Sequence, residues 1–171
     1  SGDRVLTSAF STGYTALGIR HSGATLAFAD VERGSLCLDA DAAECALAGG
    51  GIAAVVPVHI FGAAGAGWER LLASAARYGV PVIEDACQAH GARFGDRALG
   101  SFGTAAAFSF YPSKNLGALG DAGLVATSDA ALAERVRCLR SGGQRTRHDH
   151  TGQGWNSRLD ELQAAVLSLR L

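Results

Sequence analysis

The sequence contains only one lysine, Lys114, and its other basic side chains, histidines aside, are arginines. Arginine keeps its proton near neutral pH and forms no imine, whereas a lysine amine can act as a nucleophile. Chemistry that needs a side-chain amine therefore has a single candidate in this chain. The scarcity by itself has a simpler interpretation, because an Ala-, Gly- and Arg-rich sequence can retain one solvated surface lysine.

Charged residues are also scarce, at 18% of 171 residues against 48% hydrophobic ones. A chain of this length can bury one good core, so we expect one compact unit. The low charge content indicates that part of the surface is covered by another chain or by further sequence. The net charge of -1 gives no reason to invoke nucleic acid or a membrane surface as a partner.

No uninterrupted apolar run approaches the length of a membrane span, and the opening SGDRVLTSAF lacks the basic-then-apolar pattern of a signal peptide. We therefore expect a cytoplasmic protein. Both ends look cut, since the chain opens at the start of a predicted strand and closes inside an apolar helix. The expected domain is thus incomplete at both ends.

Paired cysteines and nucleotide-binding fingerprints are missing as well. The four cysteines form no CxxC pair, which argues against a zinc knuckle or a disulfide scaffold and favours small buried groups. His148-Asp149-His150 has the residue types of a metal site without a third ligand, so we expect no metal. Neither GxGxxG at the start of a helix nor GxxxxGK[ST] occurs. The cysteines are Cys37, Cys45, Cys87 and Cys138.

Apolar runs alternate with helical patterns along most of the chain. Strands are predicted at residues 3–9, 25–29, 52–58, 80–84, 105–110 and 124–127, and helices at 12–21, within 35–48, and at 69–78, 129–139 and 159–169. This alternation is typical of an α/β fold in which helices cover both faces of a mainly parallel sheet, giving three αβα layers. Ser128 or Asp129 is the expected N-cap of the helix at 129–139.

Polar residues gather where two of these strands end. Asp85 follows the strand at 80–84, with Gln88 three residues later, while Ser109 and Lys114 flank the end of the strand at 105–110. Ligands of open α/β sheets bind at the carboxyl ends of the strands. Asp85 alone could equally be a helix N-cap with a capping-box partner. That interpretation does not explain why Ser109 and Lys114 appear at the end of the next apolar strand.

These residue types match the needs of an enzyme that uses pyridoxal 5'-phosphate (PLP). Such an enzyme needs a lysine that forms a Schiff base and then moves a proton, and a carboxylate that keeps the pyridine nitrogen protonated. It also needs hydroxyl and backbone N–H groups that hold the phosphate dianion. Lys114, Asp85 and Ser109 are suited to these three tasks.

Three longer stretches, VIEDACQAHG, SFGTAAAFSFYPSKNLGALGDAG and GWNSRLDELQAAVL, resemble the sugar aminotransferases of the DegT/DnrJ/StrS family. PVHIFG at residues 57–62 and the opening at residues 4–30 share the likeness, which therefore covers almost the whole chain. The resemblance implies the PLP-binding large domain of the aspartate aminotransferase fold (fold type I) over residues 1–171. It also implies an N-terminal helix with a Gly-Thr step and a C-terminal small domain, neither of which these residues contain.

Carried over residue by residue, the resemblance implies that Lys114 forms the Schiff base with PLP and that Asp85 faces the pyridine nitrogen. It places Gln88 near the ring and its O3' atom, and it makes Ser109 a ligand of the phosphate. Lys114 and Asp85 would be the catalytic pair.

Three residues between positions 150 and 158 are implied to contact the cofactor or the substrate. Asn156 is expected to reach the phosphate of the PLP bound by a neighbouring subunit, which implies a homodimer with shared sites. His150 is expected to approach the substrate. Arg158 either binds a phosphate or carboxylate of the substrate or braces the loop.

The implied activity is the transfer of an amino group from glutamate or glutamine to a keto group of a nucleotide-linked sugar or a cyclitol. Amino sugars for a natural product or a surface polysaccharide would be its products. Relatives that dehydrate sugars carry histidine in place of the lysine, so Lys114 favours transamination over a PLP-dependent dehydration. A non-catalytic fragment, subunit or binding module is the alternative from another class.

Several departures from the family motivate that alternative. Thr12 stands where the family has an aromatic residue that stacks on the PLP ring, which leaves Phe10 or Tyr14 as substitutes. Ala66 stands where the family has an aspartate after PVHxxG.

His59 and His90 both follow strand ends, and we expect each to be a hydrogen-bonded structural histidine.

Overall fold

The computed structural model describes residues 2–171, and its central sheet consists of two joined halves. β2 (Thr25–Ala29), β1 (Arg4–Ser8) and β3 (Ile52–Val56) form one half, and β4 (Ile83–Asp85), β7 (Ala105–Ser109) and β8 (Gly123–Ala126) form the other. Parallel bridges between residues 55 and 82 and between 58 and 85 join β3 to β4. The strand order is therefore β2-β1-β3-β4-β7-β8, in which β8 runs antiparallel to β7 and the other neighbours are parallel.

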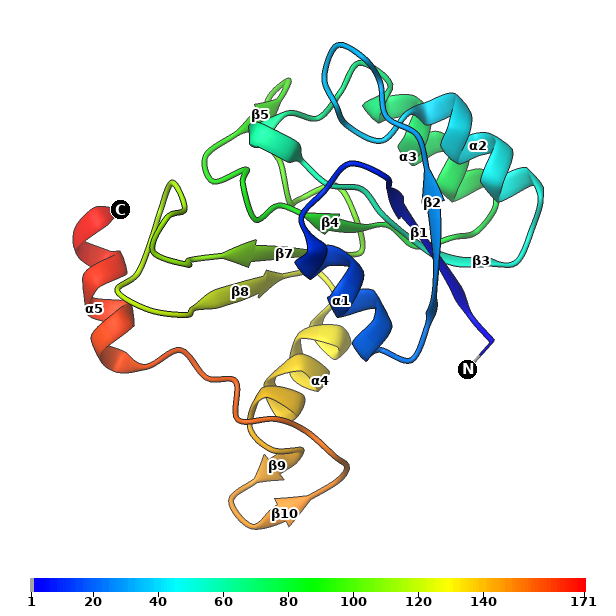
Figure 1. Cartoon of the computed structure of the whole chain (residues 1–171). Coiled ribbons are helices and arrows are strands. Elements are labelled where there is room, and N and C mark those ends of the chain that lie inside the picture. The colour runs from blue at the N-terminus through cyan, green and yellow to red at the C-terminus, as the bar shows by residue number, and fades with distance from the viewer. Residues whose placement is uncertain (1) are drawn as a thin grey trace.

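Helices cover both faces of this sheet (Figure 1). α1 (Gly13–His21) leads from β1 to β2, whereas α2 (Ala40–Ala48) and α3 (Trp68–Arg77) lead to strands in the opposite direction across the sheet. Right-handed crossovers place α1 on one face and the α2–α3 pair on the other. The predicted α/β architecture with three αβα layers is confirmed.

The main core lies between the sheet and the α2–α3 pair. Trp68, Leu71 and Ala75 recur at helical spacing along α3 and pack in one cluster with Leu6 of β1 and Val55 of β3. All five side chains are at most 2% exposed. Burial of a large apolar side chain contributes about 1.5–3 kcal/mol to stability, so this cluster anchors the strands that carry the candidate site.

α4 (Ala130–Arg140) and α5 (Glu161–Arg170) follow the sheet. Asp129 caps α4, because its carboxylate accepts hydrogen bonds from the N–H groups of Ala131 and Leu132 at 2.8 and 3.1 Å. The predicted cap is thus confirmed for Asp129. No helix among residues 2–171 has both the length and the apolar character that a membrane crossing requires.

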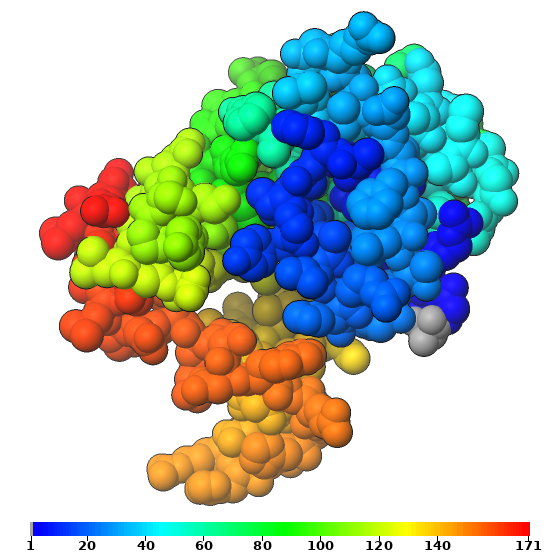
Figure 2. Space-filling view, in the orientation of Figure 1, coloured from blue at the N-terminus to red at the C-terminus, as the bar shows by residue number. Residues whose placement is uncertain are grey.

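Two short hairpins lie outside the predicted strands. β5 (Arg93–Phe94) pairs with β6 (Arg97–Ala98), and β9 (Gln144–Thr146) pairs with β10 (Asp149–His150). The sequence does not predict them, because strands of two or three residues carry no readable periodicity. The β9–β10 hairpin and α4 form a lobe that projects from the body that contains the sheet (Figure 2).

Candidate active site

The carboxyl ends of β4 and β7 lie side by side because the two strands are parallel neighbours, with Asp85 opposite Ala107. Asp85 is the last residue of β4. The sequence predicts it one position after the end of the strand. Ser109 is the last residue of β7 and therefore lies two positions beyond Ala107 on the same face. The Ser109 hydroxyl accepts a hydrogen bond from the Tyr111 N–H at 3.3 Å. The fold thus brings two of the predicted site residues to one edge of the sheet.

Lys114 lies in the tight turn that follows β7. Its N–H donates to the Tyr111 carbonyl at 2.8 Å, and the side chain is half-buried. It lines a pocket of about 400 Å³ together with Gln88 and three further residues, Phe61, Ser113 and Asn115. This volume falls in the range of small-molecule sites. Lys114 and Gln88, which the sequence analysis places in one site, do share one pocket.

Asp85 is held on both carboxylate oxygens. Oδ2 accepts a hydrogen bond from the Thr15 hydroxyl of α1 at 2.7 Å, and Oδ1 accepts one from the Cys87 N–H at 3.2 Å. Residues 86–92 form turns and no helix, so the alternative interpretation of Asp85 as a helix N-cap is wrong. Its contact with Cys87 N–H is instead an Asx-type turn. The carboxylate therefore has a fixed orientation at this end of the sheet.

The Cys87 thiol is influenced by the charges of both Asp85 and Lys114. Burial and, to a smaller extent, the negative charge of Asp85 raise the pKa of the Cys87 thiol to about 12, against the opposing positive charge of Lys114. Both charges therefore act on one side chain. A thiol with this pKa is not a nucleophile near neutral pH, in agreement with the absence of a predicted role for Cys87.

A buried hydrogen-bonded pair lies next to Asp85 in the chain fold. Glu84 is 0% exposed, and its Oε2 lies 2.8 Å from Nε2 of His59, which is 1% exposed. Glu84 also accepts hydrogen bonds from the N–H groups of residues 100, 102 and 103, each at 2.7 Å. Burial raises the pKa of Glu84, but the hydrogen bonds from His59 and the backbone outweigh it and leave the pKa below its usual value. This network ties the loop at 100–103 to the strand end that carries Asp85.

The two histidines after strand ends differ from each other. His59 is hydrogen-bonded through both ring nitrogens, since its Nδ1 lies 3.1 Å from the Ala63 carbonyl oxygen. His90 lies between Phe108 and Phe110, with ring centroids 5.5 and 5.6 Å away, and its ring nitrogens make no hydrogen bond within residues 2–171. Burial lowers the pKa of His90. The expectation of a hydrogen-bonded histidine is confirmed for His59 and wrong for His90, which packs between aromatic rings.

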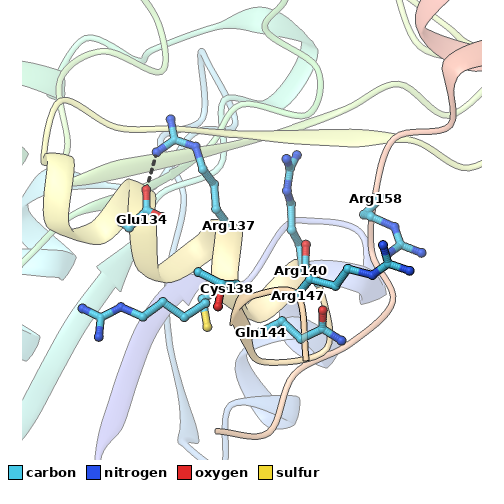
Figure 3. Close-up of a pocket in the computed structure, with 10 residues that line it drawn as sticks. Glu134, Arg137, Cys138, Arg140, Gln144, Arg147 and Arg158 are labelled. Atoms are coloured by element: carbon cyan, nitrogen blue, oxygen red, sulfur yellow. Dashed lines mark hydrogen bonds and ion pairs between the residues drawn. The ribbon is translucent and has the colours of Figure 1, made fainter. Parts of the chain in front are cut away.

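The remaining predicted residues lie in the lobe around α4. A second pocket there, of about 360 Å³, is lined by arginines from α4, the β9–β10 segment and the chain before α5 (Figure 3). Arg158 is one of them, and the others are Arg137, Arg140, Arg145 and Arg147. Arg137 pairs with Glu134 at 3.0 Å, whereas the other four form no ion pair within the described part of the chain. The lobe therefore presents several positive charges without matching negative ones.

Asn156 and His150 belong to the same lobe. Asn156 is exposed and forms an antiparallel bridge with Ser141. The ring nitrogens of His150 lie 3.1 Å from the Gln144 side-chain nitrogen and from the Gly142 carbonyl oxygen. Neither residue lines the Lys114 pocket. Across residues 2–171, no group of three or more His, Cys, Asp or Glu side chains has an arrangement that could hold a metal ion.

Comparison with known proteins identifies the family. The sequence model of the DegT/DnrJ/EryC1/StrS aminotransferase family matches residues 1–171. This chain belongs to that family. A pleiotropic regulatory protein of Geobacillus stearothermophilus is 43% identical over 169 residues, which are 99% of this chain and 45% of that protein. The dTDP-3-amino-3,4,6-trideoxy-alpha-D-glucose transaminase of Streptomyces venezuelae is 52% identical over 118 residues, which are 69% of this chain and 31% of that one.

The fold of this DegT/DnrJ/EryC1/StrS chain also matches a solved relative. A crystal structure of S. venezuelae DesV in complex with a ketimine intermediate aligns with a TM-score of 0.93 at 43% identity, over 99% of this chain and 45% of that chain. The chain therefore spans less than half the length of the relatives it matches.

The positions at which the sequence is expected to depart from the family do not line the Lys114 pocket. Thr12 is exposed and precedes α1 without a side-chain cap. Phe10 and Tyr14, the expected substitutes for the stacking aromatic, are 43% and 83% exposed. Ala66 is exposed, and its N–H donates to Glu32 at 3.0 Å.

Sequence reasoning misses three residues that shape the site. Thr15 reaches Asp85 from another element, 70 positions away, and no local pattern announces that contact. Glu84 stands next to Asp85 in the sequence, and a charged residue inside an apolar strand was the available signal for its burial. Phe61 lines the Lys114 pocket although its neighbours suggest only a turn.

Proposed function

We propose that the protein is a PLP-dependent aminotransferase that converts a keto group of a nucleotide-linked sugar, or of a cyclitol, to an amine. The observation that carries this proposal is the position of Lys114. The only lysine of the chain is half-buried and lines a pocket with Gln88, and it follows β7, whose parallel neighbour β4 ends at Asp85. A surface lysine retained by chance would not be expected there.

The residues around this pocket fit PLP. Asp85 offers a fixed carboxylate for the pyridine nitrogen, Gln88 an amide for the ring edge, and Ser109 a hydroxyl for the phosphate. Bound PLP supplies an electron-withdrawing ring that stabilises negative charge on the carbon next to the amine. These three side chains are therefore polar groups of the kinds that PLP needs.

Proton transfer falls to Lys114 and its surroundings. Nζ of Lys114 is the only side-chain amine available, and an amine can hold a proton and return it to a substrate carbon. The hydrogen bond from Thr15 keeps the Asp85 carboxylate turned toward the crevice. The Glu84–His59 pair fixes the strand end from behind.

The proposed substrate class rests on the relatives and on the arginine-lined pocket. The Streptomyces relative is named for a dTDP-linked amino sugar. Arg158 and its neighbours can bind a diphosphate through paired N–H groups. Asn156, His150 and Arg158 lie outside the Lys114 pocket, which fits a homodimer in which they serve the partner's site. Glutamate or glutamine as the donor and a cytoplasmic location belong to the same proposal.

A non-catalytic binding module is the second candidate. The Geobacillus relative is named a regulatory protein, and the position of the stacking aromatic holds an exposed threonine. A module of this kind keeps the sheet and binds PLP weakly or not at all.

The test is chemical trapping. The purified chain is mixed with PLP and reduced with borohydride, and the pyridoxyl label is located by peptide mass spectrometry. We expect the label on Lys114. Lys114→Arg keeps the positive charge, cannot form the imine, and should lose the label while it retains the melting temperature. In the complete gene product the same substitution should lower kcat on the order of 10³-fold or more.

A label that is confined to the N-terminal amine, or no label on folded protein, would favour the binding module. Product analysis with keto-sugar nucleotides then separates transamination from dehydration, since only the former consumes an amino donor.

A further inference from the structure

Phe61 combines an unfavourable backbone conformation with an exposed aromatic ring. Its φ and ψ are 54° and 19°, in the left-handed region that bulky residues rarely adopt. Its side chain is 74% exposed, so the ring gains little from burial within this chain. Glycine or asparagine would adopt this conformation with less strain. The fold therefore gives no reason for phenylalanine at this position.

The two other non-glycine residues with positive φ in the described chain do have such a reason. Leu36 packs against a buried cluster that includes Val58 and Ile60. His148 lies in the exposed β9–β10 turn, and histidine is enriched in this conformation. Phe61 has neither core packing nor a suitable residue type. Strain of this kind clusters at binding sites, where the surrounding structure enforces it.

The surroundings of Phe61 enforce its conformation from both sides. Its N–H donates to Oε1 of Gln88 at 2.7 Å, and the next N–H, of Gly62, donates to the His59 carbonyl at 3.1 Å. The preceding residues His59 and Ile60 are buried, at 1% and 4% exposure, and anchor the turn. The exposed ring is thus held at the pocket that Lys114 and Gln88 line.

We propose that Phe61 is a specificity-determining residue that packs against the face of the keto-sugar ring and selects sugars that lack a hydroxyl there. This inference rests on the proposed function. The sugar, rather than its nucleotide, is the ligand because the reacting carbon must lie at Lys114, in the same pocket. An aromatic face packs well against C–H groups. A hydroxyl pressed against it loses its water without gaining a hydrogen bond.

The test uses two dTDP-linked keto-hexoses that differ only in the 6-hydroxyl, with the complete gene product. We expect the wild type to prefer the 6-deoxy sugar on the order of 10-fold in kcat/KM and in Kd by calorimetry. Phe61→Asn tolerates positive φ and removes the ring. It should keep or raise the melting temperature, weaken the binding of the 6-deoxy sugar about 10-fold, and reduce the preference to within about threefold. Phe61→Tyr keeps an aromatic ring and should retain the preference of the wild type for the 6-deoxy sugar.

The controls separate the possible failures. Phe28→Thr removes an exposed ring of β2, 57% exposed and outside the Lys114 pocket, and should leave the preference unchanged. If Phe61→Asn still discriminated between the two sugars, the inference would be overturned. A loss of PLP affinity would also overturn it, because it would indicate that Phe61 contacts the cofactor. A change of oligomeric state would do the same, because it would indicate a subunit contact. Failure of the proposed function is distinct, because it removes the borohydride label or the turnover from the wild type as well.

Discussion

The strand ends around Asp85 and the lobe around α4 handle their polar groups in opposite ways. At the strand ends, Glu84 is fully buried with four hydrogen-bonding partners, and Asp85 is held on both oxygens. In the lobe, none of residues 130–140 is buried, and most of the arginines around the pocket form no ion pair among residues 2–171.

The difference shows which part of the site is organised within one chain. Buried and fully bonded groups keep one geometry before a ligand arrives, which suits groups that must align with a reacting atom. Solvated arginines around a helix without buried residues gain a fixed geometry only when an anion or a partner covers them. The comparison predicts large effects of substitution at the strand ends and small ones in the lobe.

The largest effect on folding is expected at Glu84. Glu84→Gln removes the charge that accepts from His59 and from three backbone N–H groups, and it should lower the free energy of unfolding by about 3–5 kcal/mol. Urea denaturation at pH 7 measures the change. Glu134→Gln, which breaks the exposed pair with Arg137 at 3.0 Å, is the matched control and should cost about 0.5 kcal/mol or less. Equal losses in both variants would contradict the contrast between the regions.

The free energy of unfolding should depend on pH because of Glu84. Its pKa in the folded protein lies below the ordinary value of 4.5. Below about pH 4.5 the unfolded chain therefore binds more protons than the folded one, and the free energy of unfolding falls as the pH falls through the folded pKa. Denaturation of the wild type and of Glu84→Gln between pH 3 and 6 checks this. The difference between them should be full above pH 5 and shrink at lower pH, whereas a constant difference would refute the linkage.

A smaller effect is expected at Thr15. Thr15→Val keeps the shape of the side chain and removes the hydrogen bond to Oδ2 of Asp85. A hydrogen bond to a charged group is worth about 1.5–3 kcal/mol, so PLP should bind roughly 10-fold more weakly. Titration of PLP absorbance measures the affinity. Thr15→Ser retains the hydroxyl and should bind PLP like the wild type; a similar loss in both variants would mean that packing, not the hydrogen bond, is responsible.

The smallest effect is expected in the lobe. Arg147→Gln should leave the free energy of unfolding within about 0.5 kcal/mol of the wild type, because the residue is exposed and forms no ion pair in the part of the chain described. The affinity for dTDP should fall about threefold, and the loss should vanish at high salt, where exposed charges are screened. Calorimetry at two salt concentrations measures the affinity for dTDP and its dependence on salt. A salt-independent loss would show that Arg147 is part of a buried site.

The places where sequence reasoning succeeded are those with local signals. Apolar runs that end in polar residues located the ends of β4 and β7, and an aspartate before an apolar helix located the cap of α4. It failed where the signal was too short or not local. The two hairpins have strands of two or three residues, and His90 packs against the rings of Phe108 in β7 and of Phe110, just after it.

By itself, the sequence determined that one lysine is available, that it follows a buried strand, and that a carboxylate ends the neighbouring one. Such facts depend on the order of residues along a few positions, which hydrophobic periodicity and turn residues reveal. Only the tertiary structure decided that Thr15 orients Asp85 across 70 residues, that His59 bonds to Glu84 across 25, and that Phe61 is held in a left-handed turn at the pocket. The reason is physical: strand register and crossover handedness choose which distant groups meet, and burial then makes each of those meetings energetically important.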